Sequence, residues 1–147
     1  PEMGLIQTCA ELGTSLVAFS PVGRALLTDR PHGLKEAKNM EFLTKNPRFI
    51  EPNISANLAY NAKFRALAAD MDTSAAALAI AWVLQKSQDV IAIPGTRSIA
   101  HLNELVAGGD MTLTEDDINR IEAVLPIGWA HGDRYSTTQW EGPEKYC

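Results

Sequence analysis

The sequence has little that would support a disulfide framework, a metal centre or a membrane segment. Cys9 and Cys147 are its only cysteines, and neither lies at a metal-ligand spacing from a histidine. Two thiols in 147 residues indicate a reducing compartment, so we expect a cytoplasmic protein without disulfides or bound metal. No apolar run reaches the roughly 18 residues of a membrane span, and no signal peptide is recognisable. The chain begins with Pro1 rather than methionine, which we interpret as a cut or processed end.

An excess of positive charge is also missing. The chain has 13 basic and 18 acidic residues, a net charge of -5. This balance argues against nucleic acid and membrane surfaces as partners, although it allows one local basic pocket. Neither a Walker loop nor a G-x-G-x-x-G motif occurs, so both usual nucleotide-binding fingerprints are absent. The composition, 46% apolar and 21% charged, is typical of a soluble globular domain.

Two short apolar runs, at about 15–20 and 90–94, predict buried strands. The first, SLVAFS, lies between Gly13 and Pro21, and the second begins with VIAI. Helical patterns alternate with these runs, which predicts an α/β fold with a parallel sheet. Two strands are too few for a parallel core of their own. We therefore interpret residues 1–147 as a single partial domain of a larger α/β protein.

The remaining segments are mostly helical patterns. We expect helices at 2–12, 55–71, 75–86, from Ser98 to the Gly108-Gly109 pair, and from Thr114 to Leu125, with a long connection over 34–54 that contains at most one short helix. Ser55 and Ser98 are the expected N-caps, and Thr114 with Asp117 resembles a capping box. The helix after Ser98 has an apolar side of Ile99, Leu102, Leu105 and Val106. The helix at 75–86 is apolar nearly all round, which predicts that it is buried.

Residues suited to phosphate follow both predicted strands. The first strand is followed by Ser20, Gly23 and Arg24, and the second by Gly95, Thr96, Arg97 and Ser98. Functional groups of α/β proteins lie at the carboxyl ends of their strands. Glycine permits close approach of a ligand, a helix N-terminus attracts anions, and arginine fits phosphate. The alternative is an ordinary Pro-Gly turn beside an exposed arginine, and the spacing alone leaves both interpretations open.

Longer segments resemble a known family. AFSPVGRALLT (18–28) and IAIPGTRSIAHLNEL (91–105), with NLAYNAKFRALAADMDTSAAALAIAWVL between them, resemble the C-terminal half of an aldo-keto reductase. The resemblance covers about the whole chain, and the tail GWAHGDRYS is similar to the ends of some bacterial members. It implies a (β/α)8 TIM barrel, of which this chain supplies the last two strands and the closing helices. The implied activity is reduction of aldehydes or ketones with NADPH.

The resemblance also implies which residues hold the cofactor. The diphosphate would lie along Ser20, Val22, Gly23 and Arg24, and the adenosine 2'-phosphate against Ile93, Gly95, Thr96 and Arg97, with His101 beside it and Glu104 on the adenine. Leu105 stands where the family has asparagine, which removes the basis for a second adenine contact. The family's catalytic tyrosine, aspartate, lysine and histidine belong to N-terminal segments that are not in this sequence. No catalytic residue is therefore assigned, and we expect the chain alone to be inactive.

The tail at 127–147 is irregular and aromatic. Trp129, Arg134, Tyr135 and Trp140 either shape a substrate pocket or pack on the outside of the barrel, and both remain open. If they shape the pocket, removal of the tail should change substrate choice and spare cofactor binding. The alternative function is a non-catalytic NADPH-binding regulatory or structural subunit. We also expect the open sheet to associate with the missing N-terminal half of the barrel or with a second copy.

Overall fold

The structure is a computed structural model that describes residues 4–139; Trp140 and Cys147 lie outside the described residues. Its elements in chain order are α1 (Leu5–Glu11), β1 (Leu16–Phe19), α2 (Leu34–Ala37), α3 (Glu41–Thr44), the 3₁₀ helix η1 (Pro47–Phe49), α4 (Asn53–Asp70), α5 (Ala75–Leu84), β2 (Val90–Ile93), α6 (Ile99–Asp110), α7 (Glu115–Val124) and the 3₁₀ helix η2 (Thr137–Gln139). Within this range, no single helix is long and apolar enough to cross a membrane; α4 and α5 reach that length and apolarity only as a pair bent by 87°.

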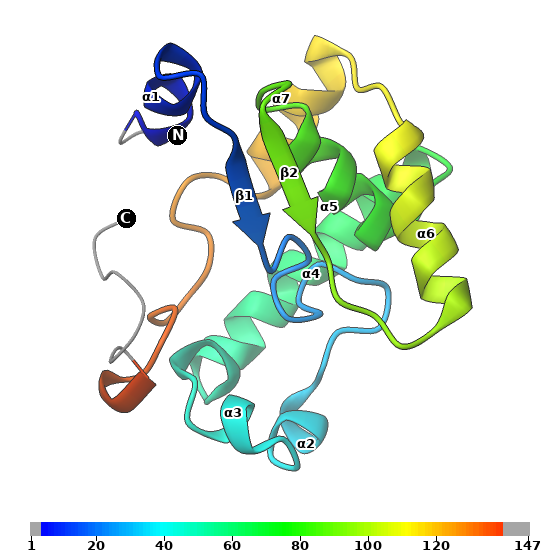
Figure 1. Cartoon of the computed structure of the whole chain (residues 1–147). Coiled ribbons are helices and arrows are strands. Elements are labelled where there is room, and N and C mark those ends of the chain that lie inside the picture. The colour runs from blue at the N-terminus through cyan, green and yellow to red at the C-terminus, as the bar shows by residue number, and fades with distance from the viewer. Residues whose placement is uncertain (1–3, 140–147) are drawn as a thin grey trace.

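The two strands form one parallel sheet, as predicted from the alternating pattern. Leu16 pairs with Val90 and Phe19 with Ile93, so the strands are in register over their whole length. Figure 1 shows β1 and β2 side by side, with both arrowheads at the same edge of the sheet. The chain segments that leave the two strands therefore start next to each other.

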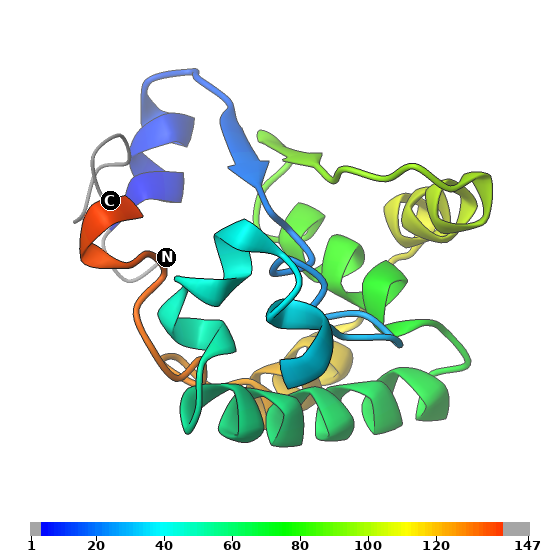
Figure 2. The same cartoon turned by 90° about the horizontal axis from the view of Figure 1, so that it is seen from below.

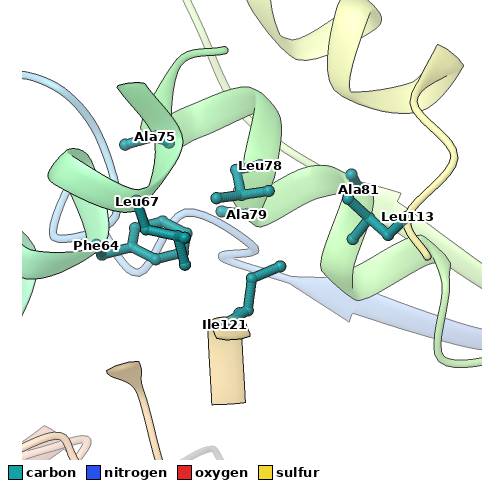
Figure 3. Close-up of a cluster of buried hydrophobic side chains, with 9 residues drawn as sticks. Phe64, Leu67, Ala75, Leu78, Ala79, Ala81, Leu113 and Ile121 are labelled. Atoms are coloured by element: carbon teal, nitrogen blue, oxygen red, sulfur yellow. The ribbon is translucent and has the colours of Figure 1, made fainter. Parts of the chain in front are cut away.

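The main core lies between α4, α5 and α7. All residues at 75–81 are buried, which confirms the prediction for α5, and the Ser74 side chain caps this helix by accepting a hydrogen bond from the Ala77 amide. Figure 3 shows Phe64 and Leu67 of α4 pointing toward Leu78 of α5 and Ile121 of α7. The predicted capping box at Thr114 and Asp117 is also present, and it starts α7.

Helix α6 does not end at its glycine pair, which corrects the prediction. The helix continues through Gly108 and Gly109 to Asp110. A Cβ atom on Gly108 would lie 2.4 Å from the Ala77 carbonyl oxygen of α5, whereas one on Gly109 would meet nothing within 4 Å. Gly108 is therefore a packing position that lets two helix backbones approach closely, and its lack of a side chain does not stop the helix.

The apolar side of α6 is not its buried side. Ile99 is 74% exposed, and Leu102 and Val106 are exposed as well, so only Leu105 of the four predicted residues is buried. The face that packs on α5 consists of Leu105 and Gly108. The close approach at Gly108 determines which side of the helix turns inward.

Within the described residues, the strands are covered on one face only. This corrects the prediction of buried strands and agrees with the expectation that a two-stranded piece leaves its sheet open. Leu16 and Ala18 are partly covered, whereas Val17, Phe19, Ile91 and Ile93 are about half exposed. Side chains alternate between the two faces of a strand, so these four residues share one face. Helix α5 packs on the opposite side, and no second layer covers the exposed face within the described residues.

Two further boundaries differ from the predictions. Helix α4 begins at Asn53 with Pro52 as its N-cap, so Ser55 lies inside the helix and its hydroxyl bonds the Glu51 carboxylate. The long connection contains α2, α3 and η1 rather than one short helix at most. Their apolar side chains form a second small core with Leu26 and Ile54.

Candidate functional site

The loops that follow the two strands begin at the same edge of the sheet. Phe19 and Ile93 are paired in register, so Ser20 and Pro94 follow them side by side. The predicted diphosphate and 2'-phosphate segments thus share one carboxyl edge, where parallel α/β folds place their ligands. The two segments differ in how they are held.

The loop after β1 has an unusual backbone. Ser20, Gly23, Arg24 and Ala25 all have positive φ, between 51° and 69°, although only one of them is glycine. Such conformations cost energy for other residues and persist only where the surroundings hold them. The Gly23 amide donates to the Ser20 carbonyl at 2.8 Å, and the Leu27 amide donates to the Val22 carbonyl at 3.0 Å. The amides of Arg24 and Ala25 have no hydrogen-bond partner among the described residues.

A row of asparagines on α4 secures this loop. Asn53, Asn57 and Asn61 recur at four-residue intervals, and the last two are 0% and 2% exposed. The Asn61 side-chain amide donates to the carbonyls of Leu26 at 2.7 Å and Thr28 at 3.0 Å. These asparagines were not among the residues predicted from the sequence. Their spacing on one side of a helix was the signal, because asparagines on a buried side must bond to other segments.

The same row holds the tail. Asn57 donates to the His131 carbonyl at 3.0 Å and accepts from the His131 amide at 2.8 Å. The Arg134 carbonyl accepts from Arg24 Nη1 at 3.0 Å and from the buried side chain of Asn46 at 2.8 Å. Figure 2 shows the tail beside the same end of α4 as the short helices. Arg24 thus joins the predicted cofactor loop directly to the tail.

A cavity of about 510 Å³ lies at the carboxyl end of β1. Its lining includes Ser20, Gly23 and three arginines, Arg24, Arg48 and Arg134. Burial lowers the pKa of the Arg24 guanidinium from its usual value. Burial, followed by the charges of Arg134 and Arg24, lowers the pKa of Arg48. The cavity is therefore a concentrated region of positive charge.

Aromatic rings orient two of these arginines. The Arg24 guanidinium lies 4.8 Å from the ring centres of both Phe42 and Tyr135, and the Arg134 guanidinium lies 4.4 Å from that of Phe19. Such cation–π contacts favour a fixed orientation without neutralising the charge. Tyr135, predicted as a substrate residue, is buried, and its ring packs against the Arg24 guanidinium. Arg134 lines the cavity.

The loop after β2 has few contacts. Ile93, Gly95, Thr96 and Arg97 are exposed, and the hydrogen bonds here are local, from the Ser98 amide to Thr96 Oγ1 and from the His101 amide to the Ser98 hydroxyl. These bonds confirm Ser98 as an N-cap. Within residues 4–139, Arg97 forms no hydrogen bond or ion pair, and the side chain of His101 is exposed while Glu104 is partly buried. This end of the sheet presents its polar groups to solvent.

Trp129 lies apart from the other predicted substrate residues. It borders a smaller, mostly apolar cavity with Pro21, Leu27 and Phe64, and its ring centre lies 5.8 Å from that of Tyr60. Arg134 thus lines the cavity with the other two arginines, whereas Trp129 borders the second cavity. Within the described part of the chain, no three histidine, cysteine or acidic side chains are grouped to hold a metal ion.

Comparisons with known proteins agree on one family. The model of the aldo/keto reductase family matches residues 1–126. A probable aldo-keto reductase of Glycine max is 34% identical over 135 residues, which cover 91% of this chain and 38% of that protein. An aldo-keto reductase of Strobilurus tenacellus is 29% identical over 134 residues, covering 91% and 40%. The chain therefore spans about two fifths of the curated relatives it matches.

Solved structures show the same fold. A glycerol dehydrogenase from Gluconobacter oxydans is similar with a TM-score of 0.66 at 23% identity, over 84% of this chain and 38% of that one. A thermostable aldo-keto reductase, solved with the inhibitor epalrestat, has a TM-score of 0.56 at 22% identity, over 84% and 35%. The predicted fold class, part of a (β/α)8 barrel with two parallel strands, is confirmed.

Proposed function

Since the chain belongs to the aldo/keto reductase family, we propose that it binds NADPH within an enzyme that reduces aldehydes or ketones. The carboxyl edge of β1 and β2 is the proposed cofactor site. The loop after β1 takes the diphosphate, and the loop after β2 takes the 2'-phosphate of the adenosine. Arg134, in the tail, is proposed to face the carbonyl substrate.

The register of the two strands is the observation that carries this proposal. Because Phe19 pairs with Ile93, the two phosphate-type loops start side by side, as one extended dinucleotide requires. Arg97 is exposed and has no protein partner among the described residues, so its forked guanidinium is available to a phosphate. An arginine already paired with a carboxylate would not suit this role.

The proposal leaves proton donation to other segments of the barrel. The chain covers 38% of the Glycine max relative, and the family resemblance assigns the catalytic tyrosine and its partners to N-terminal segments. Tyr60, on α4, packs against the rings of Trp129 and His131, which suits a supporting residue. In this proposal the chain contributes cofactor binding and no catalytic group.

Substitution of Arg97 tests the proposal. A charge-assisted contact to phosphate contributes roughly 1.5–3 kcal/mol, so Arg97→Ala should weaken NADPH binding about 10- to 150-fold and leave NADH nearly unchanged. Titration followed by nicotinamide fluorescence measures both affinities. Arg65→Ala, which removes the same charge from an exposed position on α4, is the control and should change neither. Equal losses for both cofactors would contradict the role of Arg97, and no binding of either would contradict the proposed function.

A further inference from the structure

Four side chains from outside the tail bind the same short piece of it, residues 131–134. Arg24 belongs to the loop after β1, Asn46 and Arg48 lie at η1, and Asn57 is on α4. These four side chains, which we call the clasp, come from three separate segments that tertiary packing brings to one place. Nothing in their sequence spacing relates them to the tail.

The clasp binds the main chain of the tail. Asn57 holds both main-chain polar groups of His131, and Arg48 donates through Nε to the Gly132 carbonyl at 3.3 Å. The other two clasp side chains share the Arg134 carbonyl as their acceptor. These bonds use only amide and carbonyl groups, which do not depend on the type of side chain at each position.

The side chains of this piece of the tail take no part in the hydrogen bonding. Among residues 4–139, the side chains of His131, Asp133 and Arg134 form no hydrogen bond. His131 and Asp133 are exposed, whereas the Arg134 guanidinium lies 4.4 Å from the ring centre of Phe19 and lines the cavity of about 510 Å³. The clasp therefore fixes where position 134 lies without fixing which side chain stands there.

The two asparagines of the clasp are fully buried, and each also bonds to η1. Asn46 and Asn57 are both 0% exposed. Asn46 accepts from the Arg48 amide at 3.2 Å, and Asn57 donates to the Arg48 carbonyl at 3.0 Å. A buried side-chain amide is costly without partners, and the tail main chain supplies the partners that η1 does not.

Gly132 fits this arrangement because it has no side chain. Its φ is +85°, and a Cβ atom there would lie 2.7 Å from Asn53 Nδ2 and 2.8 Å from the Pro47 carbonyl oxygen. Gly128 has a similar φ of +81°, but a Cβ atom there would meet nothing within 4 Å. Both glycines satisfy the same backbone requirement, and only Gly132 lies in close contact with η1 and α4.

We infer that Asn46, Asn57 and Gly132 are positioning residues, which fix the tail main chain so that the side chain at position 134 lines the cavity. The role of Arg134 toward a carbonyl substrate rests on the proposed function, whereas the positioning follows from the contacts of the clasp. Position 134 then determines what the cavity accepts while the tail stays in place.

Hydrogen exchange of the His131 amide in the whole protein, followed by NMR, tests the positioning. Gly132→Ala should raise the exchange rate at least tenfold relative to Gly128→Ala, which has the same φ requirement and no clash. Asn57→Leu should also raise it, because the acceptor of this amide is removed. Arg134→Ala removes only a side chain and should leave the rate within about threefold. Thermal melts establish that each variant is folded.

Substrate preference tests whether the clasp acts through Arg134. In the whole enzyme, Arg134→Ala should change the ratio of kcat/KM for benzaldehyde and butanal about tenfold in favour of benzaldehyde, because the shorter side chain leaves more room in the cavity. Gly132→Ala should change the ratio in the same direction. The double variant should go no further than Arg134→Ala alone, since both changes remove the same contact. Gly128→Ala should leave the ratio unchanged.

Equal exchange rates in folded Gly132→Ala and Gly128→Ala would overturn the inference. Additive effects of Gly132→Ala and Arg134→Ala on the kcat/KM ratio would also overturn it, and so would a Gly132→Ala variant that loses stability without any change in that ratio. A whole protein without reductase activity would contradict the proposed function, and the exchange rates alone would then decide whether the clasp positions the tail.

Discussion

The two strand ends carry similar residues but are built differently. The loop after β1 is held by side chains from α4, the long connection and the tail, including a bond between Arg24 and Arg134, which are 110 residues apart. The loop after β2 is held by hydrogen bonds between residues no more than three positions apart. One end is therefore a preorganised cavity, and the other is an exposed loop that presents Arg97 to solvent.

This difference shows how two phosphate-type sequences can serve different tasks. Preorganisation keeps the positive-φ backbone and the three arginines in place before a ligand arrives, which lowers the entropy lost on binding. An open loop gains its contacts only when the ligand is bound, which suits discrimination between cofactors by one phosphate. The comparison predicts that the loop after β1 depends on hydrogen bonds from distant residues for its stability and that the loop after β2 does not.

The largest expected effect comes from substitution of Asn61, which would destabilise the loop after β1. Asn61→Leu leaves the buried carbonyls of Leu26 and Thr28 without their donor, so the free energy of unfolding should fall by about 3 kcal/mol. Urea unfolding followed by circular dichroism measures it. Asn103→Leu makes the same change on the exposed side of α6 and should alter stability by less than about 0.5 kcal/mol. Equal effects at the two positions would mean that the asparagine row does not secure the loop.

The next effect concerns the helix that follows β2. Gly108→Ala forces α5 and α6 apart, because the new Cβ would meet the Ala77 carbonyl, and should lower the free energy of unfolding by about 2 kcal/mol. Gly109→Ala enters open space on the same helix and should raise it by up to about 1 kcal/mol. Thermal melts of the two single variants give both values. If Gly108→Ala were also stabilising, close packing of α6 on α5 would not be what anchors the β2 end.

The smallest expected effect is on cofactor affinity, and it distinguishes the role of the loop after β1 from that of the loop after β2. Deletion of residues 131–147 removes the acceptor of Arg24 and the partner of Asn57, so NADPH affinity should fall about tenfold, or ~1.4 kcal/mol. NADH affinity should fall by the same factor, because the preference between the cofactors is proposed to lie at Arg97. Deletion of 136–147 leaves these contacts and should cost less. Fluorescence titrations with both cofactors measure the effect, and intact NADPH binding after the longer deletion would show that the tail does not position the β1 loop.

Local patterns predicted much of the fold correctly. The strands, the buried helix α5, the Ser98 cap and the Thr114–Asp117 capping box are features that residues within a few positions of one another determine. The end of α6 was mispredicted because Gly108 packs closely against the backbone of Ala77, which lies on another helix. The exposed faces of β1 and β2 were mispredicted because an apolar run does not reveal which layers are present to cover it.

The sequence by itself determined the order of the two strands and the longer helices, the parallel pairing of the strands and the residue types that follow each strand. Helix periodicity, capping and strand alternation are short-range effects of backbone geometry, so they are readable without a structure. Only the tertiary structure decided that Arg24, Arg48 and Arg134 share a cavity, and that the asparagines of α4 bind the β1 loop and the tail together. Those contacts join segments up to 110 residues apart. A buried polar side chain forms hydrogen bonds with the backbone groups that tertiary packing places next to it, and these can come from any part of the chain.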